Sequence, residues 1–84
     1  MATTILVVQM DKRRETAVEV QGILTEFGCS VKTRLGIHDG VVDKCSDHGL
    51  IILELAGVKK EHQALEKRLT ALRGVKANAI SIPL

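Results

Sequence analysis

The stretch from Val31 to Ala56 reads VKTRLGIHDGVVDKCSDHGLIILELA, and the rest of the chain is organised around it. Its two ends, residues 31–37 and 49–56, are rich in aliphatic and β-branched residues and have the length of strands. Its middle, from His38 to His48, is polar and holds two of the three histidines, one of the two cysteines and three aspartates. The pattern predicts a β-hairpin with a long polar loop at its tip.

The two arms of this hairpin differ. In residues 31–37 apolar and polar residues alternate, which is typical of an edge strand with one solvated face. Residues 50–55 are apolar on both faces except at Glu54, so this arm should be a central strand. Residues 4–10 have the same two-sided pattern and should also be central. A last strand runs from Val75 to Ile82 and stops at Pro83, which cannot extend a ladder.

A helix is expected on each side of the hairpin. The first follows Asp11 and ends at Gly28 as a C′ glycine, and its apolar stripe consists of Ala17, Val20, Leu24 and Phe27. The second runs from about Lys59 to Arg73 and ends at Gly74, and its stripe consists of Val58, His62, Leu65, Leu69 and Leu72. A shift of 45 residues places the first stripe on the second, which indicates two βαβ units in tandem.

Two such units predict one domain over residues 1–84, because a chain of 84 residues is too short for two cores. With right-handed crossovers the units interleave into an α+β, ferredoxin-like βαββαβ fold. Its four-stranded antiparallel sheet has the first and third strands in the centre and both helices on one face.

This arrangement leaves the second face of the sheet uncovered, although the central strands are apolar on both sides. Leaving an aliphatic side chain in water forgoes about 1.5–3 kcal/mol relative to burying it. We therefore expect a homo-oligomer, either a dimer or a tetramer, that associates through the sheet face or the edge strands.

Composition argues against several classes of protein. Phe27 is the sole aromatic residue and the formal net charge is only +2, so neither base stacking nor a phosphate-binding stripe is expected. We expect no direct contact with nucleic acid. The apolar run from Ile5 to Val8 is too short for a signal or membrane segment, which predicts a cytoplasmic protein with no membrane contact.

Three segments stand out as a set: Arg34-Leu-Gly-Ile37, Leu50-Ile-Ile-Leu-Glu-Leu-Ala-Gly57 and Leu65-x-x-x-Leu69-x-x-Leu-x-Gly74-Val75. They resemble the iron-only hydrogenase system regulators, a family of small ACT-like proteins. The resemblance covers nearly the whole chain. It implies an ACT-like fold and a role in transcriptional or hydrogenase-related regulation, and it identifies no catalytic residue.

The wider ACT class, to which these regulators are similar, binds amino acids or other small effectors at subunit interfaces. Its members usually have a glycine in the turn between the first strand and the first helix. In this sequence the corresponding turn, Met10 to Arg14, has neither glycine nor proline. The chain departs from the class pattern at that position.

The hairpin tip has the chemistry of a metal site. His38, Cys45 and His48 offer two imidazoles and a thiolate, and Asp43 offers an oxygen, with Asp39 or Asp47 as alternatives. Such a mixed set suits Zn²⁺, Ni²⁺ or Cu²⁺. The alternative is an exposed polar loop with incidental histidines, since no second Cys-x-x-His pair is present.

A second candidate site lies at the start of the first helix, where Asp11, Lys12, Arg13 and Arg14 follow one another. Cations at the positive end of a helix invite an anionic effector, whereas the alternative is a solvated helix start. Glu54, Cys29 and His62 form no recognisable catalytic set with other residues. We expect a non-enzymatic regulatory module that senses a small effector at a subunit interface, with Zn²⁺ or Ni²⁺ as its cofactor only if the hairpin tip is a metal site.

Overall fold

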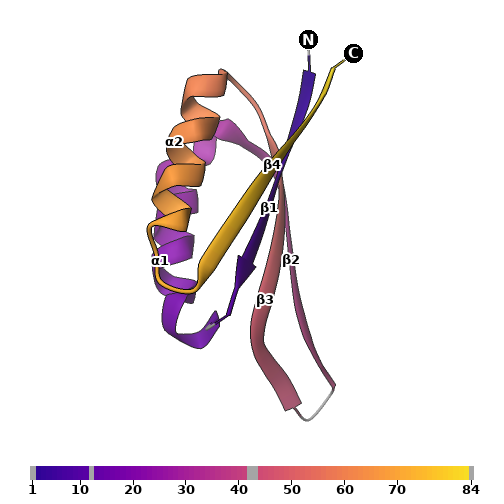
Figure 1. Cartoon of the computed structure of the whole chain (residues 1–84), viewed down its shortest axis with the longest axis vertical. Coiled ribbons are helices and arrows are strands. Elements are labelled where there is room, and N and C mark those ends of the chain that lie inside the picture. Colours follow the sequence, from indigo (N-terminus) through magenta and orange to yellow (C-terminus); the bar gives the residue numbers. More distant parts are fainter. Residues whose placement is uncertain (1, 12, 42–43, 84) are drawn as a thin grey trace.

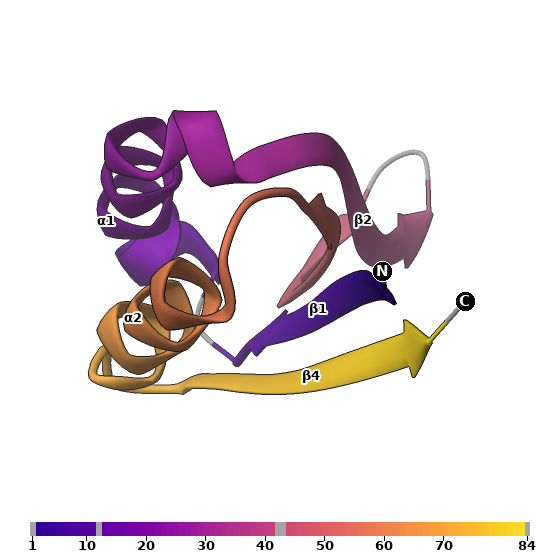
Figure 2. The ribbon, with the colours of Figure 1, turned by 90° about the horizontal axis from the view of Figure 1, so that it is seen from above.

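The computed structural model describes residues 2–11, 13–41 and 44–83, with side chains for all of these except residues 13–14, 37–41 and 44–48. The elements are β1 (Ala2–Met10), α1 (Arg13–Glu26), the 3-10 turn η1 (Gly28–Ser30), β2 (Val31–Val41), β3 (Lys44–Leu55), α2 (Lys59–Thr70) and β4 (Val75–Pro83). The strands form one antiparallel sheet in the order β2-β3-β1-β4. Both helices lie on the same side of it (Figures 1 and 2).

The predicted ferredoxin-like βαββαβ fold is confirmed, including the central position of β1 and β3. Side chains alternate between the two faces of a strand, so every second residue of β1 and β3 points toward the helices. The core therefore contains Leu6, Val8 and Met10 from β1 and Ile51, Leu53 and Leu55 from β3. None of the described helices is long and apolar enough to cross a membrane.

The helices contribute stripes close to those expected. On α1, Val20 and Leu24 are buried as predicted, Phe27 packs against the core from its margin, and Ile23 is an additional core residue. On α2, Leu65 and Leu69 are fully buried, and Leu72, just after the helix, packs against the core.

Val58 does not belong to the stripe of α2, contrary to expectation. It is 62% exposed because it occupies the extended position just before the helix, where it provides no side-chain cap. The chain reaches this position through Gly57, whose φ of +87° is in the left-handed region that favours glycine.

The prediction that Gly28 ends α1 as a left-handed C′ glycine is wrong. The helix ends at Glu26, Gly28 begins η1, and its φ is not in the left-handed region. Backbone hydrogen bonds within and beyond η1 replace the expected cap, since Ser30 N–H donates to the Phe27 carbonyl and Ala56 N–H to the Ser30 carbonyl, both at 2.8 Å. Gly74 does adopt a positive φ, of +78°, but α2 ends at Thr70 rather than at about Arg73, so Gly74 lies in the turn before β4.

The long polar loop predicted at the hairpin tip is also wrong. β2 continues to Val41 and β3 begins at Lys44, so only two residues separate the strands. Gly40 pairs with Cys45 and Val41 with Lys44, after a register irregularity between His38 and Gly40. Antiparallel strands need only a two-residue connection, and polar residues are tolerated where no layer covers them. The arms extend past the helical layer (Figure 1).

Candidate functional site

The predicted metal ligands lie on the distal arms of the hairpin. The backbone of His38 is in β2 opposite Gly49, and Cys45 and His48 are in β3. Their side chains, and Asp43 as a whole, lie outside the described residues. Among the side chains that are described, no group of three or more His, Cys, Asp and Glu residues is placed to hold a metal ion. The hairpin metal site stays a prediction.

The predicted anion site is described only at Asp11. This residue is exposed, and its backbone N–H donates to the Gly74 carbonyl at 2.8 Å, which ties the end of β1 to the turn before β4. Lys12 lies outside the described residues, as do the side chains of Arg13 and Arg14. The anion site therefore also stays a prediction.

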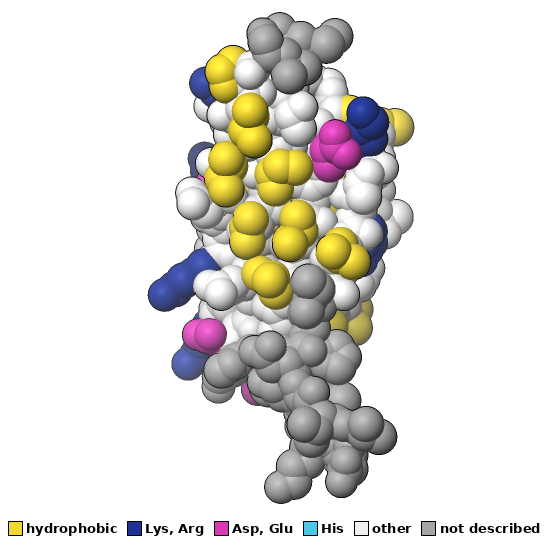
Figure 3. All heavy atoms as spheres, turned by 90° about the vertical axis from the view of Figure 1, so that its right-hand side faces the viewer, with side chains coloured by type: hydrophobic (Ala, Val, Ile, Leu, Met, Phe, Trp, Pro, Cys, Tyr) yellow, Lys and Arg dark blue, Asp and Glu magenta, His cyan; other side chains and the backbone are white. Residues whose placement is uncertain are grey.

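The surface that the structure does describe in detail is the side of the sheet turned away from the helices, which we call the open sheet face. The ladder places Ile5 of β1 between Ile80 of β4 and Glu54 of β3, and Val7 next to Ile52. Its aliphatic residues with described side chains are Ile5, Val7, Leu35, Leu50, Ile52, Ile80 and Ile82. Figure 3 shows hydrophobic side chains gathered over this face.

The aliphatic residues on the two edge strands are the most accessible ones of this face. Leu35 and Ile82 are each 54% exposed and Ile80 is 46% exposed, whereas those on β1 and β3 are half-buried by their neighbours. A contiguous apolar surface of this kind is uncommon on a monomer and typically marks an interaction site.

Glu54 is the acidic residue within this apolar surface. It accepts a hydrogen bond from the Thr33 hydroxyl at 3.4 Å, and the Lys32 Nζ lies 3.8 Å from its carboxylate. Its partners among the described side chains are thus a hydroxyl and a surface lysine. This arrangement holds the carboxylate in place.

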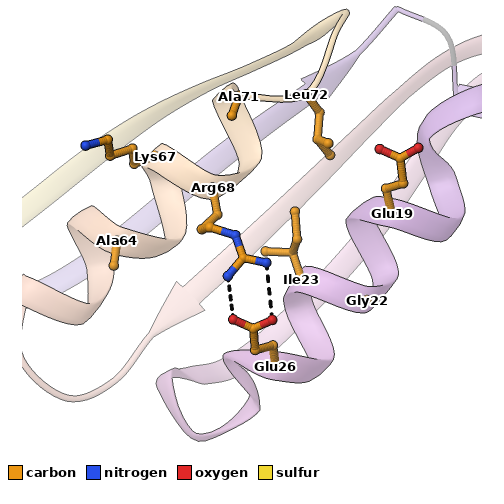
Figure 4. A pocket seen from close by; sticks show the side chains of 9 residues that line it. All are labelled: Glu19, Gly22, Ile23, Glu26, Ala64, Lys67, Arg68, Ala71 and Leu72. Atoms are coloured by element: carbon orange, nitrogen blue, oxygen red, sulfur yellow. Dashed lines mark hydrogen bonds and ion pairs between the residues drawn. The ribbon is translucent and has the colours of Figure 1, made fainter.

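A groove runs between α1 and α2 (Figure 4). The Arg68 guanidinium spans it and donates to both carboxylate oxygens of Glu26, one of them at 3.2 Å. The hydrogen bonds from Arg68 lower the pKa of Glu26, and those to Glu26 raise the pKa of Arg68. Arg68 also lies over the Phe27 ring, 5.9 Å from its centroid. Sequence analysis missed this pair because 42 residues separate the partners.

The remaining histidine and cysteine have ordinary surroundings. His62 is half-buried, and its Nε2 lies 2.7 Å from the Ala56 carbonyl. Since a carbonyl only accepts, Nε2 carries the hydrogen. Cys29 is an exposed free cysteine in a small pocket that Glu26 and Glu61 also line. Among the described residues, neither contacts a side chain that would activate it as a nucleophile or a general base.

Neither a family model nor a curated protein matches the sequence. Solved structures do resemble it. An uncharacterised protein from Thermotoga maritima superimposes with a TM-score of 0.82 and 20% identity, over 99% of this chain and 100% of that chain. The apo form of CPII, a nitrogen regulatory PII-like protein from Thiomonas intermedia K12, gives a TM-score of 0.70 and 10% identity, over 100% of this chain and 92% of that chain.

The ACT domain of GTP pyrophosphokinase from Chlorobium tepidum is also similar, with a TM-score of 0.62 and 16% identity, over 95% of this chain and 85% of that chain. The fold is that of ACT and PII-like domains. At these identities the ACT-like fold is what the proteins share, and function has to be argued from the residues of this chain.

Proposed function

We propose that this ACT-like chain is a non-enzymatic regulatory module that assembles into a homo-oligomer and responds to a small effector. The observation that carries the proposal is the open sheet face. Its aliphatic residues extend across all four strands, including the exposed Leu35 and Ile82 at its two edges.

The size of this face fits association with a second copy. With strands about 4.8 Å apart and about 3.3 Å per residue, four strands of roughly nine residues present an area near 570 Å². Two copies would cover roughly 1,100 Å², close to the lower limit of about 1,200 Å² for specific interfaces. The carboxylate of Glu54, tethered by Thr33 and Lys32, would lie at the interface beside the apolar residues.

The structural neighbours support the regulatory part of the proposal. CPII has been seen bound to ADP, AMP and bicarbonate, and the Chlorobium tepidum domain belongs to a GTP pyrophosphokinase. A small metabolite is therefore a reasonable effector class for this chain. The resemblance to iron-only hydrogenase system regulators suggests transcription or a hydrogenase system as the regulated process.

The test is the mass of the particle in solution, measured by light scattering at tens of micromolar. We expect a dimer or tetramer for the wild-type chain and a monomer for Ile80→Glu, because a charge on the open sheet face would have to be desolvated. The matched control is Val18→Glu, which places the same charge on the exposed side of α1. A wild-type chain that stays monomeric, or an Ile80→Glu variant that still assembles, contradicts the proposal.

A second candidate function is metal sensing by the hairpin. His38 is in β2, and Cys45 and His48 are in β3, the strand that pairs with β2. Titration calorimetry of the reduced, metal-free chain with Zn²⁺ and Ni²⁺ tests this function. Binding of one ion at submicromolar affinity that the double variant Cys45→Ala, His48→Ala abolishes would support it, and binding that survives the double variant would reject it.

A further inference from the structure

A cavity of about 650 Å³ lies beneath the first two turns of α2, on the helical side of the sheet, and we call it the α2 cavity. Its floor comes from the start of β1 and the end of β4, and its wall from α2 and the segment that precedes it. It is lined by Ala2, Thr4, Leu55, Ala56, Gly57, Lys59, His62, Gln63, Glu66, Ala79 and Ser81. The volume is within the range of about 300–1,000 Å³ typical of small-molecule sites.

The cavity exists because side chains become small toward this end of the sheet. The helix-facing residues of β1 pass from Met10, Val8 and Leu6 to Thr4 and Ala2. Those of β4 that line the cavity are Ala79 and Ser81. On α2, Leu65 is fully buried, but the residue one turn before it on the same side of the helix is His62, which is polar. The core therefore stops short of the strand ends, and the space left there has a floor of small side chains under a polar wall.

Two opposite charges line this wall. Lys59 and Glu66 are seven residues apart on α2, which separates their backbone positions by about 10 Å along the helix axis. Neither forms an ion pair with any side chain that the structure describes. A ligand that follows the cavity thus meets one ammonium group and one carboxylate, with no excess of either charge.

Between these charges the wall offers groups that bind amides. Gln63 provides both a donor and an acceptor. His62 uses Nε2–H for the Ala56 carbonyl, which leaves Nδ1 as its contact atom. From the floor, the hydroxyls of Thr4 and Ser81 add donors and acceptors.

We infer that the α2 cavity binds a short linear zwitterion with the length of a di- or tripeptide. Its carboxylate would contact Lys59 and its amine Glu66, and its amide groups would meet Gln63 and His62. An extended chain covers about 3.3–3.6 Å per residue, so two or three residues span about 7–11 Å. The charges of a single α-amino acid are too close together to reach both ends. The inference rests on the proposed function, because it assigns the effector and its site.

The experiment is calorimetric titration of the wild-type chain with trialanine, and with trialanine blocked by N-acetylation or C-amidation. We expect one molecule of trialanine to bind per chain and each blocked peptide to bind at least about tenfold more weakly, the equivalent of about 1.4 kcal/mol. Alanine alone should not bind. In the Lys59→Gln variant, free and C-amidated trialanine should bind with equal affinity. In the Glu66→Gln variant, free and N-acetylated trialanine should bind with equal affinity.

Matched controls come from the same helix. Lys60→Gln and Glu61→Gln change the same charges on exposed residues that do not line the α2 cavity, and should leave binding unchanged. Ala79→Leu should abolish binding by filling the floor, with the helical circular dichroism retained.

Absence of binding at millimolar trialanine, or equal affinity for free and blocked peptides, overturns the inference. In that case an oligomer that binds ADP or another metabolite would leave the proposed function intact, whereas a monomer without ligand would end both.

Discussion

Arg68 of α2 binds both carboxylate oxygens of Glu26 of α1, so one bidentate pair joins the two helices across the groove between them (Figure 4). A planar guanidinium matches the geometry of a carboxylate, which a lysine ammonium does not. The same guanidinium lies over Phe27 at the edge of the core. The pair therefore links the two helices at that end of the groove.

Replacement of Arg68 by Ala should lower the midpoint of urea unfolding, because the pair and the contact with Phe27 are both lost. Arg68→Lys should have an intermediate effect, since it keeps the charge without the paired hydrogen bonds. The pair is solvent-exposed, so we expect a small change. Arg73→Ala, at an exposed arginine outside the groove lining, is the control. Equal midpoints for wild type and Arg68→Ala would show that the pair contributes nothing to stability.

The same pair predicts a pH dependence. Hydrogen bonds from Arg68 hold the pKa of Glu26 below its ordinary value of 4.5 in the folded chain. Between the folded and unfolded pKa values the unfolded chain binds more protons, so stability decreases as the pH falls. The stability difference between wild type and Glu26→Gln should be constant above pH 4.5 and shrink below it. Urea titrations from neutral pH to pH 3 measure this difference, and one that grows toward low pH would contradict the assignment.

Leu65 of α2 and Leu53 of β3 are both fully buried in the core between the helices and the sheet. Replacing either one by Ala should destabilise the chain by about 2–5 kcal/mol, through lost burial and the cavity left behind. Val18→Ala, at a residue that is 82% exposed, should change stability by less than about 0.5 kcal/mol. Urea unfolding at one fixed protein concentration separates the two outcomes. A loss below about 1 kcal/mol for Leu65→Ala would mean that α2 does not pack as described.

Gly57 and Gly28 form a matched pair for testing backbone conformation. A Cβ added at either position meets no atom within 4 Å, but only Gly57 has a positive φ, of +87°. Gly57→Ala should therefore cost about 1–2 kcal/mol from backbone strain alone. Gly28→Ala should be neutral, or stabilise by up to about 1 kcal/mol through the unfolded state. Equal effects in thermal unfolding would rule out the left-handed conformation of Gly57.

The architecture was predictable because two periodicities recur along the chain. The spacing of Leu65 and Leu69 predicted the buried stripe of α2, and the two-sided pattern of residues 50–55 predicted a central strand. These signals reflect burial, which dominates the energy of folding. The prediction for Gly28 failed because α1 passes into η1 through backbone hydrogen bonds that do not require a left-handed residue.

The candidate sites were less predictable than the fold. The polar segment between the hairpin strands was interpreted as a loop, since sequence shows polarity but not whether backbone pairing continues through it. The contact between Glu26 and Arg68 joins distant residues and has no local signature. The α2 cavity depends on the register that sets Thr4 opposite Ser81. The one sequence signal for this cavity was the presence of small residues at the ends of two strands. Only the pairing of those strands shows that these residues lie side by side and form the floor of one cavity.

The ladder between β1 and β4 also places Ala2 opposite Pro83 (Figure 1). Residues 2 and 83 are neighbours in space, so a short linker between them would close the backbone into a ring without moving either strand. The ring could be reopened between α2 and β4, where no residue lines the α2 cavity, to give a circular permutant with the same sheet. Such a rearranged chain would still bring the floor and the wall of the α2 cavity together, because the floor depends on strand register and the wall on the packing of α2 against the sheet, and neither depends on the order of synthesis.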